Sequence, residues 1–271
     1  MAVALSPNYA ALDVPEVLTR LFYPRPEFRA FGSPTAATEV LIPVDPGVAI
    51  GGRFYGAEAG APTLLFFHGN GEIVADYEDL GPLYVQRGLN FLAVDYRGYG
   101  RSTGSPTVTA MMRDCHAILA FAREWLHNQG FSGPLAVMGR SLGSASALEL
   151  ACHYQDLLDG LIVESGFAFA APLLKLLGVD VEALGFAEKT GFRNVDKIGR
   201  WTKPLLIMHA EFDQIIPFAE GQALFDACPS PDKTLLKVRG ADHNDILAQG
   251  FAAYMEAVVR LAALLLDRKS E

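Results

Sequence analysis

The sequence is poor in cysteine and has a deficit of cationic side chains. Its three cysteines, Cys115, Cys152 and Cys228, are widely spaced and form no CxxC pair, which argues against a disulfide framework and against thiolate zinc ligands. We therefore expect a reducing, cytoplasmic setting. The 22 lysines and arginines are outnumbered by 31 aspartates and glutamates, which leaves a net charge of −9. This balance argues against a nucleic-acid partner, because binding to a phosphate backbone depends on an excess of cationic side chains.

We also expect no targeting signal and no membrane-spanning segment. Residues Met1 to Pro7 have neither the basic nor the apolar region of a signal peptide. The longest apolar run near the end of the chain, Leu261 to Leu266, is far shorter than the roughly 20 residues that a bilayer requires. We therefore expect no membrane span. Hydrophobic residues nevertheless make up 51% of the 271 residues, which is enough to build the core of a globular protein.

Short apolar segments alternate with longer segments of helical periodicity along most of the chain. This alternation is typical of the α/β class, in which a mostly parallel sheet carries helices on both faces. Eight strands are predicted, at 37–42, 49–55, 63–68, 90–94, 135–139, 160–164, 205–209 and 234–238. Helices are predicted at 77–87, 109–128, 142–153, 218–227 and 245–268.

Two regions depart from this alternation. The first two predicted strands are separated only by residues 43–47, which is too short for a crossover helix, so they are expected to form an antiparallel hairpin at the sheet edge. Residues 167–194 are apolar and punctuated by glycine, and they indicate a short helical lid. Because no repeat or long polar linker divides the chain, we predict a single domain over residues 1–271, with the lid as an insertion at about 167–194.

The strongest chemical signal is the GxSxG motif of residues 139–143, which read Gly-Arg-Ser-Leu-Gly. The motif follows a predicted strand and opens a predicted helix, the context in which it presents a nucleophilic serine. Side chains in place of Gly139 or Gly143 would crowd the strained turn that exposes the hydroxyl. We predict that Ser141 is the nucleophile; the alternative is an ordinary surface-turn serine.

A serine hydroxyl is a weak nucleophile and needs a base that a carboxylate orients. The order to look for along the chain is serine, then an acid, then histidine. Of the six histidines, only His209 and His243 come far enough after Ser141 to serve. His209 ends a predicted strand, where local packing or hydrogen bonding is expected. His243 lies in a loop between the last strand and the final helix, and it is predicted to be the base.

The predicted acid is Asp213, in the loop after the strand at 205–209. Glu164 ends the preceding strand and is its rival, since a carboxylate there could reach the imidazole in a variant arrangement. Glu211 is a lesser candidate. A buried, hydrogen-bonded position at the strand end is the alternative expectation for Glu164.

Acyl transfer also requires hydrogen-bond donors aimed at the developing oxyanion. The backbone N–H of Leu142, directly after the serine, is predicted to be one donor. The N–H of Asn70, in the loop His68-Gly69-Asn70-Gly71, is predicted to be the other, because the glycines beside it allow a close approach to the substrate carbonyl. His68 is expected to brace this loop rather than to transfer a proton.

These motifs together resemble the α/β-hydrolase superfamily. Within it, the chain is similar to small serine hydrolases that carry an HGN loop, a DYRGYG segment and a GRSLG turn, here at residues 68–70, 95–100 and 139–143. Asp213 followed by Ile216-Pro217, and His243 within residues 242–245, complete the likeness, which runs from about residue 37 to the C-terminus. The chain departs from that branch at Ser144 and Ala210, where glycine is more usual. The DYRGYG segment is expected to be architectural, through turn glycines and an Asp/Arg pair.

The resemblance implies hydrolysis of an ester, thioester or amide without a cofactor. We predict a serine esterase or thioesterase that forms an acyl-enzyme; the alternatives are a peptidase or amidase with the same triad, or a non-catalytic binding protein of the same fold. No metal-ligand spacing and no GxGxxG or Walker pattern is found, so neither a metal nor a nucleotide is implied. The expected partner is a small-molecule ester or other acyl substrate.

The lid is predicted to supply an acyl or aryl pocket for small to medium groups, since sites form at the carboxyl ends of strands in open α/β sheets. The alternative is that it merely packs a small helix onto the sheet. The expected lining residues are Phe167, Phe169, Leu173, Leu176, Leu177 and Phe186.

Overall fold

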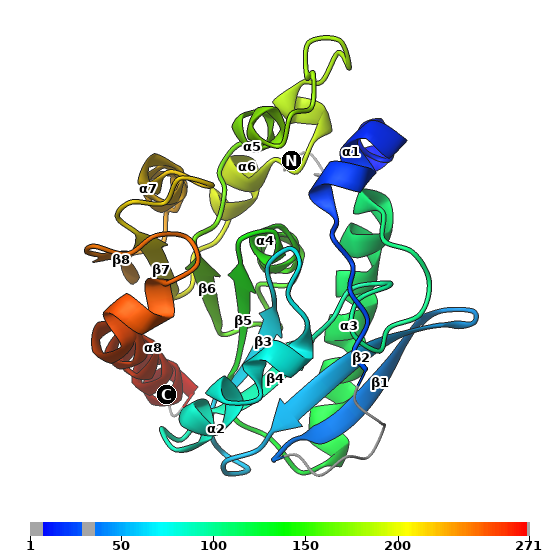
Figure 1. The fold of residues 1–271 in the computed structure, drawn as a ribbon. Coiled ribbons are helices and arrows are strands. Elements are labelled where there is room, and N and C mark those ends of the chain that lie inside the picture. The colour runs from blue at the N-terminus through cyan, green and yellow to red at the C-terminus, as the bar shows by residue number, and fades with distance from the viewer. Residues whose placement is uncertain (1–7, 29–35, 270–271) are drawn as a thin grey trace.

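The computed structural model describes residues 8–28 and 36–269, which are built around an eight-stranded sheet with the order β1-β2-β4-β3-β5-β6-β7-β8 (Figure 1). β1 and β2 form an antiparallel hairpin at one edge, and β2 is also antiparallel to β4; the remaining pairs are parallel. The predicted fold class and edge hairpin are therefore confirmed. The strands are β1 (Thr38–Asp45), β2 (Val48–Tyr55), β3 (Thr63–Phe67), β4 (Asn90–Val94), β5 (Leu135–Arg140), β6 (Gly160–Glu164), β7 (Leu205–Ala210) and β8 (Lys233–Val238).

Helices cover both faces of the sheet (Figure 1). α3 (Val108–Asn128), α4 (Gly143–His153), α6 (Asn194–Ile198) and α7 (Phe218–Ala227) pack on one face. α2 (Leu80–Val85) and α8 (Ile246–Lys269) pack on the other. Every residue of β3, β4 and β6 is buried, as expected of parallel strands enclosed on both sides. The helix predicted at 77–87 is shorter than expected, because a 3₁₀ turn, η2 (Val74–Tyr77), precedes α2.

The lid and the N-terminal segment lie next to each other at the top of Figure 1. The lid contains α5 (Ala170–Leu176) and η3 (Glu188–Thr190), and α6 follows it. The N-terminal segment forms η1 (Tyr9–Leu12) and α1 (Pro15–Leu21), neither of which was predicted. Arg20 of α1 donates a hydrogen bond of 3.0 Å to the carbonyl of Leu177, so the two regions are in direct contact.

Helix α8 is the one described helix that is long and apolar enough, by length and composition, to cross a membrane. It packs an apolar side against the sheet, mostly within the core that it shares with α2. The absence of a membrane span stays a prediction, and residues 1–7 lie outside the described part of the chain. The buried residues of α8 are Ile246, Tyr254, Met255, Val258, Leu261, Ala262 and Leu265.

A buried ion pair ties the N-terminal segment to helices α4 and α6. Glu149 Oε2 lies 2.6 Å from Lys197 Nζ and accepts a hydrogen bond of 3.0 Å from the Tyr9 hydroxyl. Burial lowers the pKa of Lys197. Burial alone would raise the pKa of Glu149, but His116 and Lys197 lower it to about 2. Each buried charge therefore depends on its partner.

We expect Lys197→Met to lower the free energy of unfolding by about 3–5 kcal/mol, because it removes the lysine that pairs with the buried Glu149 carboxylate and leaves only His116 and His153 beside it. Denaturant titration followed by circular dichroism measures this change. Lys175→Met removes an ion pair between two exposed side chains, Lys175 and Glu182, and should leave stability unaltered. Equal effects of the two variants would contradict the prediction.

The same ion pair makes stability depend on pH. The folded-state pKa of Glu149, about 2, lies below its ordinary value of 4.5. Its contribution to stability is therefore present above about pH 4.5 and is lost as the pH falls toward 2.

Candidate active site

Ser141 lies in the sharp turn between β5 and α4, with a φ of 51°. This left-handed conformation is strained for a residue with a side chain. A Cβ atom on Gly139 would lie 2.3 Å from the carbonyl oxygen of Gly143, and one on Gly143 would lie 2.1 Å from that of Phe67. Both glycines are therefore required by the packing of the turn, as the sequence predicted.

The three residues predicted as nucleophile, base and acid lie within hydrogen-bond distance of one another. His243 Nε2 is 3.0 Å from Ser141 Oγ, and His243 Nδ1 is 2.7 Å from Asp213 Oδ2. They come from loops after three different strands, β5, β7 and β8, which end at the same edge of the sheet. All three residues are buried.

Asp213 is held by its backbone surroundings as well as by the imidazole. Its Oδ1 accepts hydrogen bonds from the N–H groups of Ile215 at 3.0 Å and Ile216 at 2.7 Å. Burial alone would raise the pKa of Asp213, but the hydrogen bond to His243 and the N–H of Ile216 hold it below its ordinary value. The carboxyl group therefore stays ionised beside the imidazole.

The rival candidates have other partners. His209 Nε2 lies 2.7 Å from the carbonyl oxygen of Ile216, and burial lowers the pKa of the ring, so this histidine is engaged locally as predicted. Glu164 accepts hydrogen bonds from Arg140 Nε at 3.0 Å and from the Tyr254 hydroxyl at 2.6 Å. It is thus a buried, hydrogen-bonded group at a strand end. Glu211 accepts a hydrogen bond of 3.0 Å from the N–H of Gly240.

The loop that carries Asn70 is fixed by hydrogen bonds to its side chain. Asn70 Oδ1 accepts from the N–H of Tyr23 and from the Tyr99 hydroxyl, both at 2.7 Å. The other expected donor, Leu142, is the N-cap of α4, where helix N–H groups favour negative charge. The sequence did not reveal the role of Tyr23, which precedes the segment that resembles a known family. Tyr99 lies in the DYRGYG segment, so its position beside the loop agrees with an architectural role.

His68 braces the same loop, as expected. Its Nδ1 lies 2.7 Å from the carbonyl oxygen of Gly69, and its Nε2 lies 3.2 Å from Asp95 Oδ1. The Tyr96 hydroxyl donates a hydrogen bond of 2.6 Å to the carbonyl of His68. Asp95 and Tyr96 both belong to the DYRGYG segment, which therefore supports the loop.

The chain is similar to several known proteins. Residues 60–190 match the family model for serine aminopeptidase, S33. Alpha/beta hydrolase domain-containing protein 17B of Homo sapiens is 33% identical over 200 residues, which cover 69% of this chain and 62% of the relative. The same-named protein of Xenopus laevis is 32% identical over 213 residues, which cover 74% of this chain and 66% of the relative.

The chain belongs to the α/β-hydrolase superfamily. It spans slightly less than two thirds of the length of these curated relatives. An esterase of Pyrococcus furiosus superposes with a TM-score of 0.67 at 17% identity, covering 89% of this chain and 100% of that structure. A soluble variant of monoglyceride lipase from Saccharomyces cerevisiae gives a TM-score of 0.63 at 20% identity, with coverages of 88% and 99%. At these identities the structural likeness shows the α/β-hydrolase fold alone.

In this α/β-hydrolase, the lid and the loop after β7 line an open apolar cavity of about 160 Å³. Phe167, Phe169, Leu173 and Leu176, all predicted as pocket residues, are among its lining. Phe186, also predicted as a pocket residue, is not in that lining; its ring lies against Gly191. The remaining residues of the cavity are Pro172, Gln214, Ile215, Ile216, Pro217 and Glu220.

Phe186 and Leu177 are partly buried against the main core. For these two residues the structure matches the alternative expectation, in which the lid packs onto the domain. One part of the lid therefore packs on the core, and another part lines the cavity.

Ser144 stands where similar hydrolases usually have glycine, and its hydroxyl finds a hydrogen-bond partner within the turn. Its hydroxyl donates a hydrogen bond of 2.6 Å to the carbonyl of Ser141. Ser144 is fully buried beside Gly166, where an added Cβ would lie 2.8 Å from the Ser144 Cβ. The extra hydroxyl is therefore satisfied within the turn.

The described residues hold no group of three or more histidine, cysteine, aspartate or glutamate side chains arranged to bind a metal ion. The three cysteines are free. Cys115 and Cys228 are buried in the main core, and Cys152 is half-buried.

Proposed function

We propose that this α/β-hydrolase cleaves a carboxylic ester or thioester through an acyl-enzyme intermediate. The observation that carries the proposal is the chain of contacts from Asp213 Oδ2 through the imidazole of His243 to Ser141 Oγ, with separations of 2.7 and 3.0 Å. The Pyrococcus furiosus esterase and the yeast monoglyceride lipase share the fold, which supports an ester substrate.

In the proposed mechanism, Ser141 Oγ attacks the acyl carbonyl while its proton passes to His243 Nε2. Asp213 accepts the Nδ1–H of His243, which fixes the tautomer and stabilises the imidazolium. The N–H groups of Leu142 and Asn70 bind the tetrahedral oxyanion. Collapse transfers the proton from His243 to the leaving alcohol or thiol, and a water molecule that His243 activates then releases the acid and regenerates the serine.

A panel of matched substrates tests this proposal against its alternatives. The wild-type protein is assayed on p-nitrophenyl esters, acyl thioesters and aminoacyl p-nitroanilides, and it is labelled with a fluorophosphonate whose site is mapped by peptide mass spectrometry. We expect hydrolysis of esters or thioesters and labelling at Ser141. Preferred hydrolysis of anilides would favour a peptidase, the activity named in the matching family model. A protein that neither hydrolyses nor is labelled would be a binding protein of the same fold.

The cavity beside the lid predicts the acyl preference. Its volume, about 160 Å³, fits small to medium acyl groups, so kcat/KM should peak at short chains. Leu176→Ala should shift the optimum toward longer chains, because it widens a cavity in which each methylene contributes about 1–3 kcal/mol of discrimination. The measurement is kcat/KM for esters from acetyl to palmitoyl.

Phe186→Ala is the matched control for Leu176→Ala, because Phe186 belongs to the same lid but lies outside the cavity lining. It should leave the chain-length preference unchanged. A steady rise of kcat/KM from acetyl to palmitoyl in the wild type, or the same selectivity in all three proteins, would contradict the prediction.

A further inference from the structure

We propose that Arg140, the residue before the nucleophile, is a positioning residue that holds the loops of the catalytic centre in register with one another. The inference rests on the proposed function. Arg140 occupies the first variable position of the GxSxG motif, so the motif itself assigns it no role. Its side chain is only 11% exposed and lines a second cavity, whose lining shares no residue with the cavity beside the lid.

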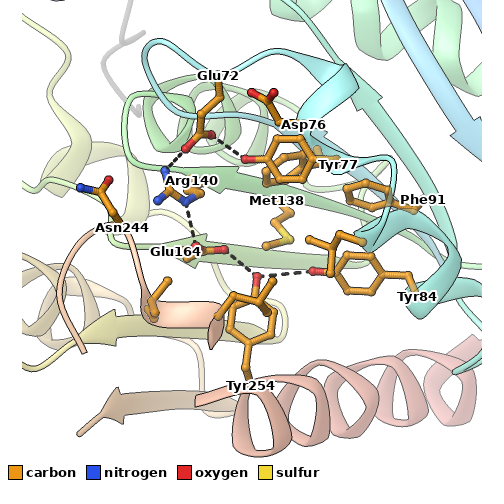
Figure 2. Close-up of a pocket in the computed structure, with 14 residues that line it drawn as sticks. Glu72, Asp76, Tyr77, Tyr84, Phe91, Met138, Arg140, Glu164, Asn244 and Tyr254 are labelled. Atoms are coloured by element: carbon orange, nitrogen blue, oxygen red, sulfur yellow. Dashed lines mark hydrogen bonds and ion pairs between the residues drawn. The ribbon is translucent and has the colours of Figure 1, made fainter. Parts of the chain in front are cut away.

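The guanidinium group of Arg140 binds three acceptors in three directions. Its Nε donates to Glu164 Oε1 at 3.0 Å, one Nη donates to Glu72 Oε1, and the other donates to the backbone carbonyl of His243 at 2.9 Å. Figure 2 shows Glu72 and Glu164 on either side of Arg140. The sheet register pairs Arg140 of β5 with Glu164 of β6, so these two residues lie next to each other on adjacent strands.

The contact with Glu72 fixes the loop of the proposed oxyanion donor. The other carboxylate oxygen of Glu72 accepts a hydrogen bond of 2.7 Å from the N–H of Gly69, directly before Asn70, and one of 2.5 Å from the Tyr77 hydroxyl. A Cβ atom on Gly69 would lie 2.8 Å from an Nη atom of Arg140. The glycine of the HGN motif therefore leaves the space that the guanidinium group occupies.

The contact with the His243 carbonyl fixes the backbone of the proposed base. The ring of His243 makes contacts of 2.7 and 3.0 Å with Asp213 and Ser141, so a small shift of its backbone changes both. Glu164, which accepts from Arg140, also accepts a hydrogen bond from the Tyr254 hydroxyl (Figure 2). Tyr254 lies on α8, the helix that follows the histidine loop. Arg140 is thus joined to the oxyanion loop, the nucleophile turn and the histidine loop.

The electrostatic surroundings of Arg140 keep its guanidinium group charged, as a positioning role requires. Burial alone would lower the pKa of Arg140, but the carboxylates of Glu72 and Glu164 raise it, so the guanidinium group stays charged. Only arginine presents a planar set of five N–H donors that can serve acceptors in three fixed directions. A lysine would keep the charge and lose this geometry.

The test compares Arg140→Lys and Arg140→Ala with a matched control, Arg97→Lys. Arg97 is also 11% exposed and donates two hydrogen bonds to the buried carboxylate of Asp114, at 2.6 and 2.8 Å, but its ion pairs are with Asp114 and Asp45 rather than with the triad. We expect both Arg140 variants to lose about 100-fold in kcat with little change in KM, because a misplacement of about 1 Å has that cost. Arg97→Lys should keep its kcat even where stability falls.

Chemical rescue provides a readout that a structural role would not change. The cavity of about 220 Å³ that Arg140 lines, between the η2–α2 segment and α8, includes Glu72 and Glu164 in its lining and has room for a guanidinium ion. Millimolar guanidinium chloride should therefore restore part of the kcat of Arg140→Ala, whereas sodium chloride at the same concentration should not. If Arg140→Ala does not fold, Arg140→Lys and Glu72→Gln carry the test through kcat and the rate of fluorophosphonate labelling.

Wild-type kcat in Arg140→Lys, or equal losses in the Arg140 and Arg97 variants at equal stability, would overturn the inference. A raised KM with an unchanged kcat would also overturn it, because that pattern indicates lost substrate binding. A wild-type protein that is neither labelled nor active would instead overturn the proposed function, so the two failures are distinguishable.

Discussion

Replacing Ser141 with alanine is expected to leave a folded protein whose kcat is lower by about 10⁴- to 10⁶-fold. The loss is large because the variant lacks the atom that forms the acyl-enzyme, and removing a nucleophile from such a triad leaves only the contribution of the oxyanion donors and of binding. Stability should change little, since alanine and serine face the same backbone strain at a φ of 51°. Ester hydrolysis and fluorophosphonate labelling measure the outcome.

Ser165→Ala is the matched control for this experiment. Ser165 is also a buried serine at the end of a central strand, and it also has a positive φ, 45°. It should retain both labelling and turnover, which separates loss of the nucleophile from a general disturbance of a strained serine. Stoichiometric labelling that persists in Ser141→Ala would show that another residue is the nucleophile.

Asp213→Asn is expected to lower kcat by about 10⁴-fold. The amide can keep the hydrogen bonds from the backbone of Ile215 and Ile216, so the loop should stay in place. It cannot supply the negative charge that stabilises the imidazolium, and an amide N–H that faces Nδ1 favours the wrong tautomer of His243. Steady-state kinetics on the preferred ester, with folding checked by circular dichroism, measures the effect.

The kcat values of Glu164→Gln and Glu211→Gln, compared with that of Asp213→Asn, show which carboxylate serves as the acid. Glu164→Gln should have a much smaller effect on kcat than Asp213→Asn, because Glu164 acts through Arg140 and Tyr254 rather than on the imidazole. Glu211→Gln should have almost none, since its contact is with the N–H of Gly240. If Glu164→Gln were the most damaging of the three, the acid would be Glu164.

The sheet and the candidate triad were predictable from the sequence because their signals are local. Each central strand is a short apolar run, and the structure places the strands 90–94 and 160–164 at the predicted bounds. The GxSxG motif is likewise a contiguous signal for one turn. In a parallel sheet, loops that follow neighbouring strands meet at one edge, so the positions of Asp213 and His243 along the chain were enough to bring them near Ser141.

The N-terminal helix and the contacts of Arg140 were not predictable in the same way. Helix α1 has seven residues, of which only Val17 and Leu21 are buried, so its periodicity is too short to recognise. Arg140 contacts residues that are 24, 68 and 103 positions away, and a sequence gives no sign of such pairings. The lid was predicted as a segment, but the separation of Phe186 from the cavity depends on how that segment folds.

The glycines around the proposed nucleophile have a consequence for protein engineering. An added Cβ would lie within 2.3 Å of a backbone atom at both Gly139 and Gly143, so variant libraries that diversify these positions would consist largely of unfolded members. Leu176 is 56% exposed and lines the apolar cavity, so it tolerates many side chains. Directed evolution toward new acyl groups should therefore draw its successful mutations from the lid while the turn at the nucleophile stays invariant.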